Sequence, residues 1–288
     1  MKLFVYGTLR KGQSNNQIIE NASIFSAQAR IKGKLYDTGY EYPALVLKGD
    51  TYVFGEIHEV DDKLLPKLDM LEDYDESRLD NLYYRTKKMI ETDKGAVEAW
   101  VYVIDHQHEQ ELNQLVPFQD WSIYQWYASV KEVNYFAYGS CMDLERIEKA
   151  GMKREFSNVV GIGTLDSHTM DYLISQNDGG RADIIESDVT DKVEGIIYAV
   201  SKKAIDYLFH REGVHSGNYR PILINIQTEQ GTLKEVLSFT VIHKETPCAP
   251  PKHYSTEILR GAKDRLSAGY YKKLEKNLDI LTKNSNNR

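Results

Sequence analysis

Short apolar runs separated by polar residues recur along the chain and predict strands around short helices. The runs LFVY, YVFGEIHEV and AWVYVI, at 3–6, 52–60 and 99–104, are rich in strand-forming residues and are bounded by Gly, Asp or charged residues. Between the second and third runs, leucines recur at helical spacing, at Leu64, Leu65, Leu68 and Leu71. After a polar stretch, DWSIYQWYASVKEV predicts a closing helix and linker, with Asp120 as its N-cap.

The second half of the chain repeats this order of elements. MKLFVYGTLRKG at the start is matched by VNYFAYGSCMDLERI at 133–147, and four further blocks match in the same order: ARIKGKLYD with VVGIGTLDS, YVFGEIHEV with KVEGIIYAV, LDMLEDYD with LFHREGV, and YYRTKKMIE with NYRPILINI. These matches place Gly33 opposite Gly163 and Tyr84 opposite Tyr219, and the pairs Gly55–Gly195 and Glu72–Glu212 share an offset of 140 residues. A chain of 288 residues exceeds one average domain, so we predict a tandem duplication with domains at 1–130 and 131–288.

Composition narrows the class of protein. The chain is 41% hydrophobic and 27% charged, as is typical of a folded globular protein. Its net charge of -7, without runs of Lys and Arg, argues against nucleic acid as a partner. Cys141 and Cys248 are the sole cysteines, which excludes a disulfide framework and fits a reducing cytoplasm. Because no run approaches the ~18 apolar residues of a membrane span and the start lacks the apolar core of a signal peptide, we expect a cytoplasmic protein without a membrane partner.

Each half opens with a strand that stops at a Tyr-Gly pair followed by a hydroxyl residue. The two loops are Tyr6, Gly7, Thr8, Leu9 and Tyr138, Gly139, Ser140, Cys141. Gly lets the backbone turn through a conformation that other residues resist, so that successive NH groups can point the same way and hold a carboxylate or an oxyanion. One such loop alone would indicate a tight turn without a ligand, and its recurrence at matched places weakens that interpretation.

Glu72 and Glu212 are the candidate acid-base groups. Within LEDYDE, Glu72 alone would suggest only a solvated helix end, whereas Glu212 lies beside Gly213 in a pattern that can present a carboxylate to a cleft. His210 and His215 flank Glu212 but lack the spacing of two ligands on one helix face, so we expect no metal. Cys141 follows a Gly-Ser turn like a thiol nucleophile, yet Leu9 takes its place in the first half, which favours a packing role.

Several of these motifs resemble the gamma-glutamylcyclotransferase superfamily. FVYGTLRKGQSN, LDMLEDYD and the following YYR are similar to the gamma-glutamylamine cyclotransferase, AIG2-like branch. YFAYGSCM, VEGIIYAV, REGVHSGNY and PPKHYSTEILRGAKDRLSAGYYKKL are similar to the gamma-glutamylcyclotransferases of the glutathione pathway. The resemblance implies an α+β fold, made here of two tandem, small, mainly antiparallel β barrels with peripheral helices.

The resemblance also implies an activity and its residues. Glu72 and Glu212 would be catalytic, and the two loops together with Tyr84 and Tyr219 would bind a small-molecule gamma-glutamyl substrate. The α-amine of such a substrate can attack its own γ-carbonyl, giving 5-oxoproline and a free amine without a cofactor.

Two departures from the family pattern leave alternatives open. Cys141 stands where the second loop usually has Asn, and Phe209 where an Asp usually lies three residues before the acid, while the first half keeps Asp69. These changes favour the alternative of a non-catalytic small-molecule-binding protein with degenerate sites. A hydrolase that releases glutamate, using the same Glu to activate water, is the third hypothesis.

Overall fold

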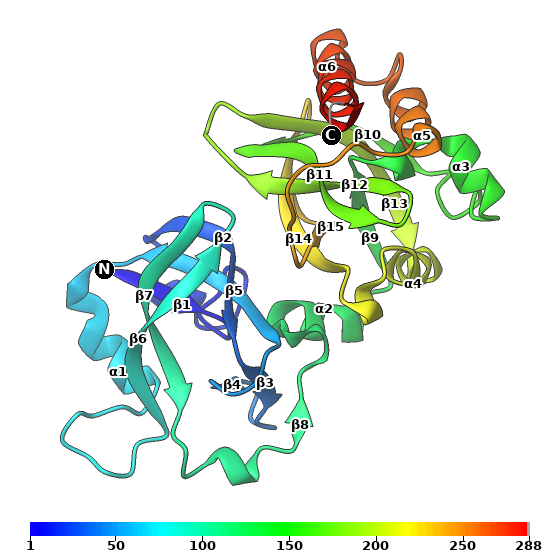
Figure 1. Ribbon diagram of the computed structural model, residues 1–288. Helices are drawn as coiled ribbons and strands as arrows, with labels where there is room; N and C mark the ends of the chain where they lie inside the picture. Colours follow the sequence, from blue (N-terminus) through cyan, green and yellow to red (C-terminus); the bar gives the residue numbers. More distant parts are fainter. Residues whose placement is uncertain (287–288) are drawn as a thin grey trace. The chain divides into compact units, whose positions relative to one another are not determined.

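The computed structural model describes residues 1–286, and the chain divides into two compact units, of which the first is Met1–Ser129 and the second begins at Val130 (Figure 1). This break lies one residue before the boundary expected from the sequence. Each unit is built around its own closed five-stranded barrel.

The first barrel has the strand order β1-β5-β2-β6-β7, and all neighbouring pairs are antiparallel except the parallel pair of β1 and β7. Its strands are β1 (Lys2–Val5), β2 (Ser23–Lys32), β5 (Tyr52–Glu59), β6 (Tyr83–Thr92) and β7 (Gly95–Ile104). A small second sheet contains β3 (Lys34–Asp37), β4 (Pro43–Val46) and β8 (Gln114–Leu115). The helices are α1 (Leu65–Leu71) and α2 (Trp121–Ser129), and Asp120 caps α2 by accepting a hydrogen bond from the Ile123 backbone NH at 3.1 Å.

The second barrel repeats this topology, with the order β10-β13-β9-β15-β14 and a parallel pair of β9 and β15. Its strands are β9 (Glu132–Ala137), β10 (Val159–Asp166), β13 (Lys192–Ser201), β14 (Tyr219–Thr228) and β15 (Gly231–Val241). Beside it lie the hairpin β11 (His168–Gln176) and β12 (Gly179–Glu186) and the helices α3 (Leu144–Lys149), α4 (Lys202–Arg211), α5 (Lys252–Ala262) and α6 (Ala268–Asn286). The predicted fold of two tandem, mainly antiparallel barrels with peripheral helices is confirmed.

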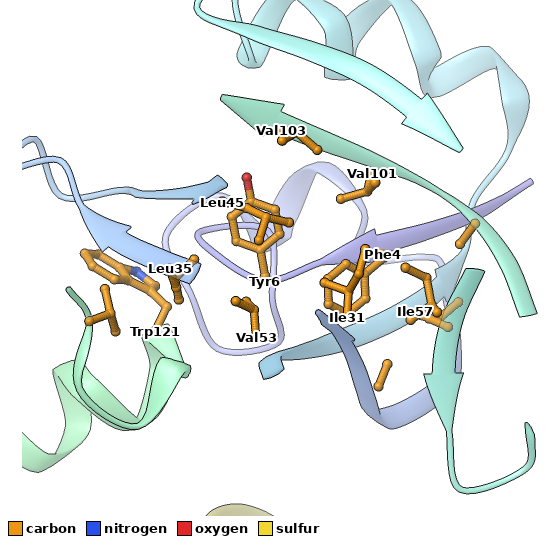
Figure 2. Packing of buried hydrophobic residues seen from close by; sticks show 14 residues of the cluster. Phe4, Tyr6, Ile31, Leu35, Leu45, Val53, Ile57, Val101, Val103 and Trp121 are labelled. Atoms are coloured by element: carbon orange, nitrogen blue, oxygen red, sulfur yellow. The ribbon is translucent and has the colours of Figure 1, made fainter. Parts of the chain in front are cut away.

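Apolar side chains from every strand fill the first barrel. Phe4, Ile57 and Val101 are at most 1% exposed and pack together in its interior (Figure 2). Burying a side chain of this size stabilises the fold by roughly 1.5–3 kcal/mol, so these short strands depend on the shared core and not on their own propensity.

One glycine in each barrel shows that the halves are copies. A Cβ at Gly55 would lie 2.3 Å from the Val5 carbonyl oxygen, and a Cβ at Gly195 would lie 2.4 Å from that of Ala137. In both cases the next nearest atoms belong to the phenylalanine that precedes the carbonyl residue. Both barrels therefore require a residue without a side chain at the same close strand approach.

Strand register corrects two of the sequence matches. Ala29 pairs with Gly55 as Gly163 pairs with Gly195, so Ala29, and not Gly33, is the counterpart of Gly163. The other correction concerns the last hairpins, where Thr92 donates to the Gly95 carbonyl oxygen at 2.7 Å and Thr228 to that of Gly231 at 2.8 Å. Counting back from these turns, β6 begins at Tyr83 and β14 at Tyr219. Tyr83, and not Tyr84, is therefore the counterpart of Tyr219. The match based on the shared Tyr-Arg pair is displaced by one residue, and such a displacement moves a side chain to the other face of a strand.

Candidate functional site

A cavity of about 200 Å³ opens beside the first glycine loop, at the end of β1. Loop residues, aromatic side chains and one carboxylate line it, including Tyr6, Gly7, Thr8, Leu9, Asn15, Tyr42, Leu71, Glu72, Tyr83 and Tyr102. The structure thus brings the first-half loop and Glu72 together, although 62 residues of chain separate Leu9 from Glu72.

The loop glycines differ from the expectation. Neither Gly7 nor Gly139 has a positive φ, so the argument from a backbone conformation that other residues resist is wrong here. Gly7 is required by space instead, because a Cβ there would lie 2.8 Å from Cγ of Pro43. Asn15 secures the loop, since its side-chain amide donates to the Thr8 hydroxyl at 3.0 Å and its backbone NH to the Thr8 carbonyl at 2.9 Å.

Two tyrosine hydroxyls hold the walls of this cavity. Tyr6 donates to the Tyr102 carbonyl at 2.9 Å, and Tyr83 donates to the Pro43 carbonyl at 3.0 Å. Burial raises the pKa of both tyrosines, so both hydroxyls stay protonated and keep donating. Tyr84, expected as a substrate residue, does not line the cavity and is 36% exposed, because successive side chains of β6 point to opposite faces.

Glu72 lies directly after α1, where its backbone NH still donates to the Leu68 carbonyl at 3.0 Å. The next residue, Asp73, has φ of 50°, a left-handed conformation that ends the helix. Within residues 1–286 the Glu72 carboxylate has neither a hydrogen bond nor an ion pair, and burial raises its pKa to about 7. A carboxyl group in this state can take up or release a proton near neutral pH.

Asp69 does not line the cavity but hydrogen-bonds to a residue that does. Its carboxylate accepts hydrogen bonds from Arg85 at 2.7 and 2.8 Å and from the Tyr102 hydroxyl at 2.7 Å. Since Tyr102 lines the cavity and accepts from Tyr6, Asp69 supports the wall and does not face a ligand.

The second domain keeps the same supporting hydrogen bonds. Tyr138 donates to the Phe239 carbonyl at 2.8 Å, and Tyr219 donates to the Ala182 carbonyl at 2.7 Å. A cavity of about 20 Å³ is lined by Tyr138, Gly139, Ser140, Cys141 and Glu212. Tyr254 of α5 also lines it, and its hydroxyl accepts from the Ala182 backbone NH at 3.2 Å.

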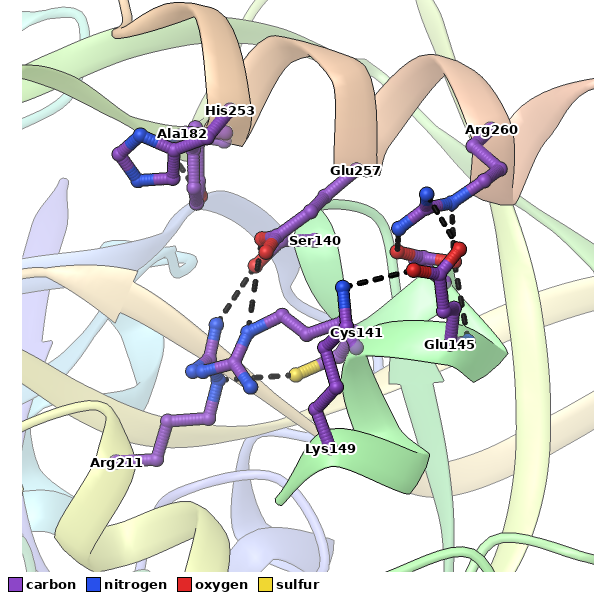
Figure 3. A network of polar contacts seen from close by, with 12 residues as sticks. Ser140, Cys141, Glu145, Lys149, Ala182, Arg211, His253, Glu257 and Arg260 are labelled. Carbon is purple, nitrogen blue, oxygen red and sulfur yellow. Dashed lines mark hydrogen bonds and ion pairs between the residues drawn. The ribbon is translucent and has the colours of Figure 1, made fainter.

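Glu212 follows α4 as Glu72 follows α1, but it has close polar neighbours. The Nε of Arg211 lies 3.4 Å from its Oε1, and the Cys141 thiol donates to the same oxygen at 4.0 Å. Arg211 also donates to Ser140 Oγ at 2.7 Å and to Cys141 Sγ at 3.3 Å (Figure 3). Burial raises the pKa of Glu212, and Arg211 opposes that rise. Burial raises the pKa of the Cys141 thiol as well, which disfavours a nucleophilic thiolate.

A larger pocket, of about 340 Å³, adjoins this small cavity and shares Glu212 and Tyr254 with it. Its lining is polar and includes Arg146, Arg181, Arg211, Tyr219, His253 and Glu257. The three arginines could not be grouped from the sequence, because they come from α3, β12 and α4 and approach one another only in the folded chain. Arg211 had the one local signal, its place directly before Glu212.

Residues 1–286 hold no group of three or more His, Cys, Asp or Glu placed to bind a metal ion. None of the helices in this range is long and apolar enough to cross a membrane.

Comparison with known proteins agrees with this architecture. The family model described as "Gamma-glutamyl cyclotransferase, AIG2-like" matches residues 3–123, and that of the "AIG2-like family" matches residues 192–274. "Putative gamma-glutamylcyclotransferase YkqA" of Bacillus subtilis is 35% identical, over 98% of both chains. The chain belongs to the gamma-glutamylcyclotransferase, AIG2-like family. The resemblance found in the sequence is confirmed.

Further relatives of this cyclotransferase-family chain cover about half of it or nearly all of it. The crystal structure of YkqA matches 97% of this chain and 98% of its own, with a TM-score of 0.86 and 34% identity. "Gamma-L-glutamyl-butirosin B gamma-glutamyl cyclotransferase" of Niallia circulans is 37% identical over 42% of this chain and 76% of its own length. "Gamma-glutamylcyclotransferase" of Bos taurus is 33% identical over 49% of this chain and 76% of its own length. The tandem arrangement is thus shared with YkqA.

Proposed function

We propose that this protein converts gamma-glutamyl amines or amino acids to 5-oxoproline and a free amine, with Glu72 as the proton-transfer group of the first domain. The observation that carries the proposal is the unpaired, half-buried Glu72 carboxylate, whose pKa is about 7, facing a cavity that ends at the glycine loop. Family membership supports the reaction class, because relatives named gamma-glutamylcyclotransferases or putative gamma-glutamylcyclotransferases match about half of the chain or nearly all of it.

The reaction is an intramolecular acyl transfer. The substrate's α-amine attacks its own γ-carbonyl carbon, a new C–N bond closes the five-membered ring, and the original amide C–N bond breaks. Free α-amines have a pKa of ~7.7–8.0, so a carboxylate at about 7 can accept the proton that the attacking nitrogen loses. The same carboxyl group then returns the proton to the leaving amine. No external nucleophile or cofactor is needed, because holding the folded substrate supplies the advantage of proximity.

The remaining groups of the cavity would hold the substrate in that folded form. Backbone NH groups of Gly7, Thr8 and Leu9 are the donors we assign to its carboxylate or to the developing oxyanion. Tyr6 and Tyr83 form a fixed aromatic wall, because their hydroxyls are already engaged by backbone carbonyls. These roles make the loop a binding element and Glu72 the sole acid-base group of this site.

For the second domain we propose the same reaction at Glu212, with Tyr138, Gly139, Ser140, Cys141 and Tyr219 on the substrate side. The matching tyrosine-to-carbonyl hydrogen bonds support this assignment. The alternative of a binding domain without turnover is favoured by one observation, the Arg211 side chain that already engages Ser140, Cys141 and Glu212. Both cysteines are free thiols, which supports a cytoplasmic location.

Product analysis tests the proposal. The purified full-length chain is incubated with gamma-glutamyl amines and gamma-glutamyl dipeptides, and 5-oxoproline and glutamate are quantified together. The proposal expects 5-oxoproline and free amine in equal amounts. Release of glutamate instead would assign a hydrolase, and the absence of both products with every compound would assign a binding protein.

A further inference from the structure

The two domains differ at two equivalent positions of their ligand pockets. Leu71 precedes Glu72 and lines the first cavity, whereas Arg211 precedes Glu212 and lines the second pocket. The carbonyls of Pro43 and Ala182 accept the equivalent tyrosine hydrogen bonds, so the residues before them, Tyr42 and Arg181, also correspond. Tyr42 and Arg181 line the respective pockets as well.

These two differences change the charge of the residues that line the pocket. Glu72 is the one charged residue among those lining the first cavity, and no cation accompanies it there. Three arginines and His253 line the second pocket against Glu212 and Glu257. Burial raises the pKa of both glutamates, and the Arg211 guanidinium opposes that rise in each.

The arginine side chains are largely buried and held in place. Arg211 is 16% exposed and hydrogen-bonded to the loop (Figure 3). Arg146 is 24% exposed and lies 3.5 Å from Glu257 of α5. Arg181 is 21% exposed, pairs with Asp178 at 2.6 Å and lies over the Tyr254 ring. Such preorganised guanidinium groups suit planar carboxylates, since each can donate two parallel hydrogen bonds.

We propose that the second domain selects gamma-glutamyl compounds whose leaving part carries carboxylates, such as gamma-glutamyl dipeptides of acidic amino acids, and that Arg181 and Arg211 determine this specificity. The gamma-glutamyl end of this ligand rests on the proposed function, whereas the acidic end rests on the arginines alone. The first domain, with Tyr42 and Leu71 at the same positions, accepts neutral leaving parts.

Binding to a chain without acid-base groups tests the proposal independently of turnover. In the full-length Glu72→Gln, Glu212→Gln double variant, calorimetry compares gamma-glutamylglutamate with the neutral probe gamma-glutamylethylamide. Into this background we place Arg181→Tyr and Arg211→Leu, which install the residues of the first domain, and Arg154→Leu, an exposed control in the same domain. We expect each pocket variant to bind gamma-glutamylglutamate about 10- to 100-fold more weakly, the worth of one charged hydrogen-bonding group. The neutral probe and the control should change less than twofold.

Three results would overturn the inference: arginine variants that weaken the acidic and the neutral probe alike, arginine variants that bind like the control, or inorganic phosphate bound as tightly as the acidic dipeptide. Circular dichroism checks that each variant is folded, and Arg181→Lys, which keeps the charge, should recover part of the affinity. Turnover is followed separately in Glu72→Gln, which retains the second site. If that variant binds the acidic dipeptide through its arginines but forms no 5-oxoproline, cyclisation at Glu212 fails while the specificity stands.

Discussion

Leu71 and Arg211 occupy the same position in the two domains, each directly before the glutamate that follows a helix. The leucine leaves Glu72 without an ion pair, so burial alone acts on its pKa and raises it to about 7. The Arg211 guanidinium, 3.4 Å from Glu212, favours the charged form of that acid and opposes the effect of burial. Burial alone thus acts on the pKa of Glu72, whereas at Glu212 a neighbouring cation opposes the effect of burial.

The pH dependence of each site should follow this difference. The attacking step needs the carboxylate form, so the rate of the first site, measured in Glu212→Gln, rises as pH increases through about 7. The second site, measured in Glu72→Gln with the same substrate, should rise at lower pH. Arg211→Leu should move its profile upward. Profiles of kcat/KM between pH 5 and 9 check this, and superimposable profiles for the two sites would contradict it.

The free energy of unfolding should also depend on pH through the Glu72 carboxyl group. Because the folded-state pKa of Glu72 is raised from 4.5 to about 7, folding favours the protonated acid, and this group costs nothing below pH 4.5. As pH rises through 7 the cost grows to as much as about 3 kcal/mol, since each pKa unit is worth ~1.36 kcal/mol. Glu72→Gln should therefore unfold at higher urea concentration than wild type at pH 8 and match it at pH 4. The exposed Glu76→Gln serves as the control.

Loss of the acid should abolish turnover at its own site. Gln keeps the shape of Glu but cannot accept a proton, so Glu72→Gln and Glu212→Gln should each lower the rate at their site by about 10²- to 10⁴-fold. Binding should survive in both. 5-Oxoproline assays of the single and double variants decide this, and a double variant with the wild-type rate would exclude the glutamates as acid-base groups.

The strand-rich character of both halves and the pairing of the two acids were accessible from the sequence for physical reasons, whereas the barrel fold was implied by the family resemblance. Strand and helix periodicity is local, and Glu72 and Glu212 lie in blocks of the same length, so the offset of 140 residues pairs them correctly. Tyr84 was matched to the wrong residue because a Tyr-Arg pair occurs in both halves at positions that do not correspond. The register is set by the hairpin turns at Thr92 and at Thr228.

The arginine pocket and the smaller second loop cavity were not accessible. Arg146, Arg181 and Arg211 meet only through tertiary structure, and Tyr254 reaches the second loop from a helix that the first domain lacks. Neither hydrophobic periodicity nor a short motif indicates which distant residues come into contact.

Phe209 is one of three residues that differ together between the two domains. Asp69 accepts from Arg85 and Tyr102 in the first domain, where Arg85 and Tyr102 are cross-strand partners. In the second domain Pro221 and Phe239 are the equivalent partners, and the rings of Phe209 and Phe239 lie 5.8 Å apart, edge to face. Hydrogen-bonded polar side chains in the first domain thus correspond to apolar side chains in the second. The absence of an Asp at position 209 is therefore no sign by itself of a degenerate site.

This replacement predicts non-additive stability. Asp69→Phe, Arg85→Leu and Tyr102→Phe should each destabilise the first domain, because each leaves polar partners unsatisfied, at a cost of about 1–3 kcal/mol. The triple variant should lose at least about 1 kcal/mol less than the sum of the three, since contacting residues couple by 0.5–3 kcal/mol in order of magnitude. Urea unfolding measures all four proteins. Simple additivity would show that the three side chains act independently.

The last prediction concerns Arg10, which follows the first loop directly. Its guanidinium lies 3.2 Å from Glu56 and 2.6 Å from Asp120, and all three side chains are at most 10% exposed. Asp120 also caps α2, so one buried cation joins the loop to that helix. Removing it leaves two buried carboxylates without their shared cation, and Arg10→Met should cost about 3–5 kcal/mol.

The loss should appear in two places at once. Hydrogen exchange should accelerate both in the loop and in α2 (Trp121–Ser129), and KM at the first site should rise more than kcat falls, because the loop NH groups bind substrate in our proposal. Lys87→Met breaks an exposed pair with Glu98, at 3.0 Å, and should cost at most about 1 kcal/mol. If Arg10→Met is no more disruptive than this control, the buried ion pairs do not hold the loop.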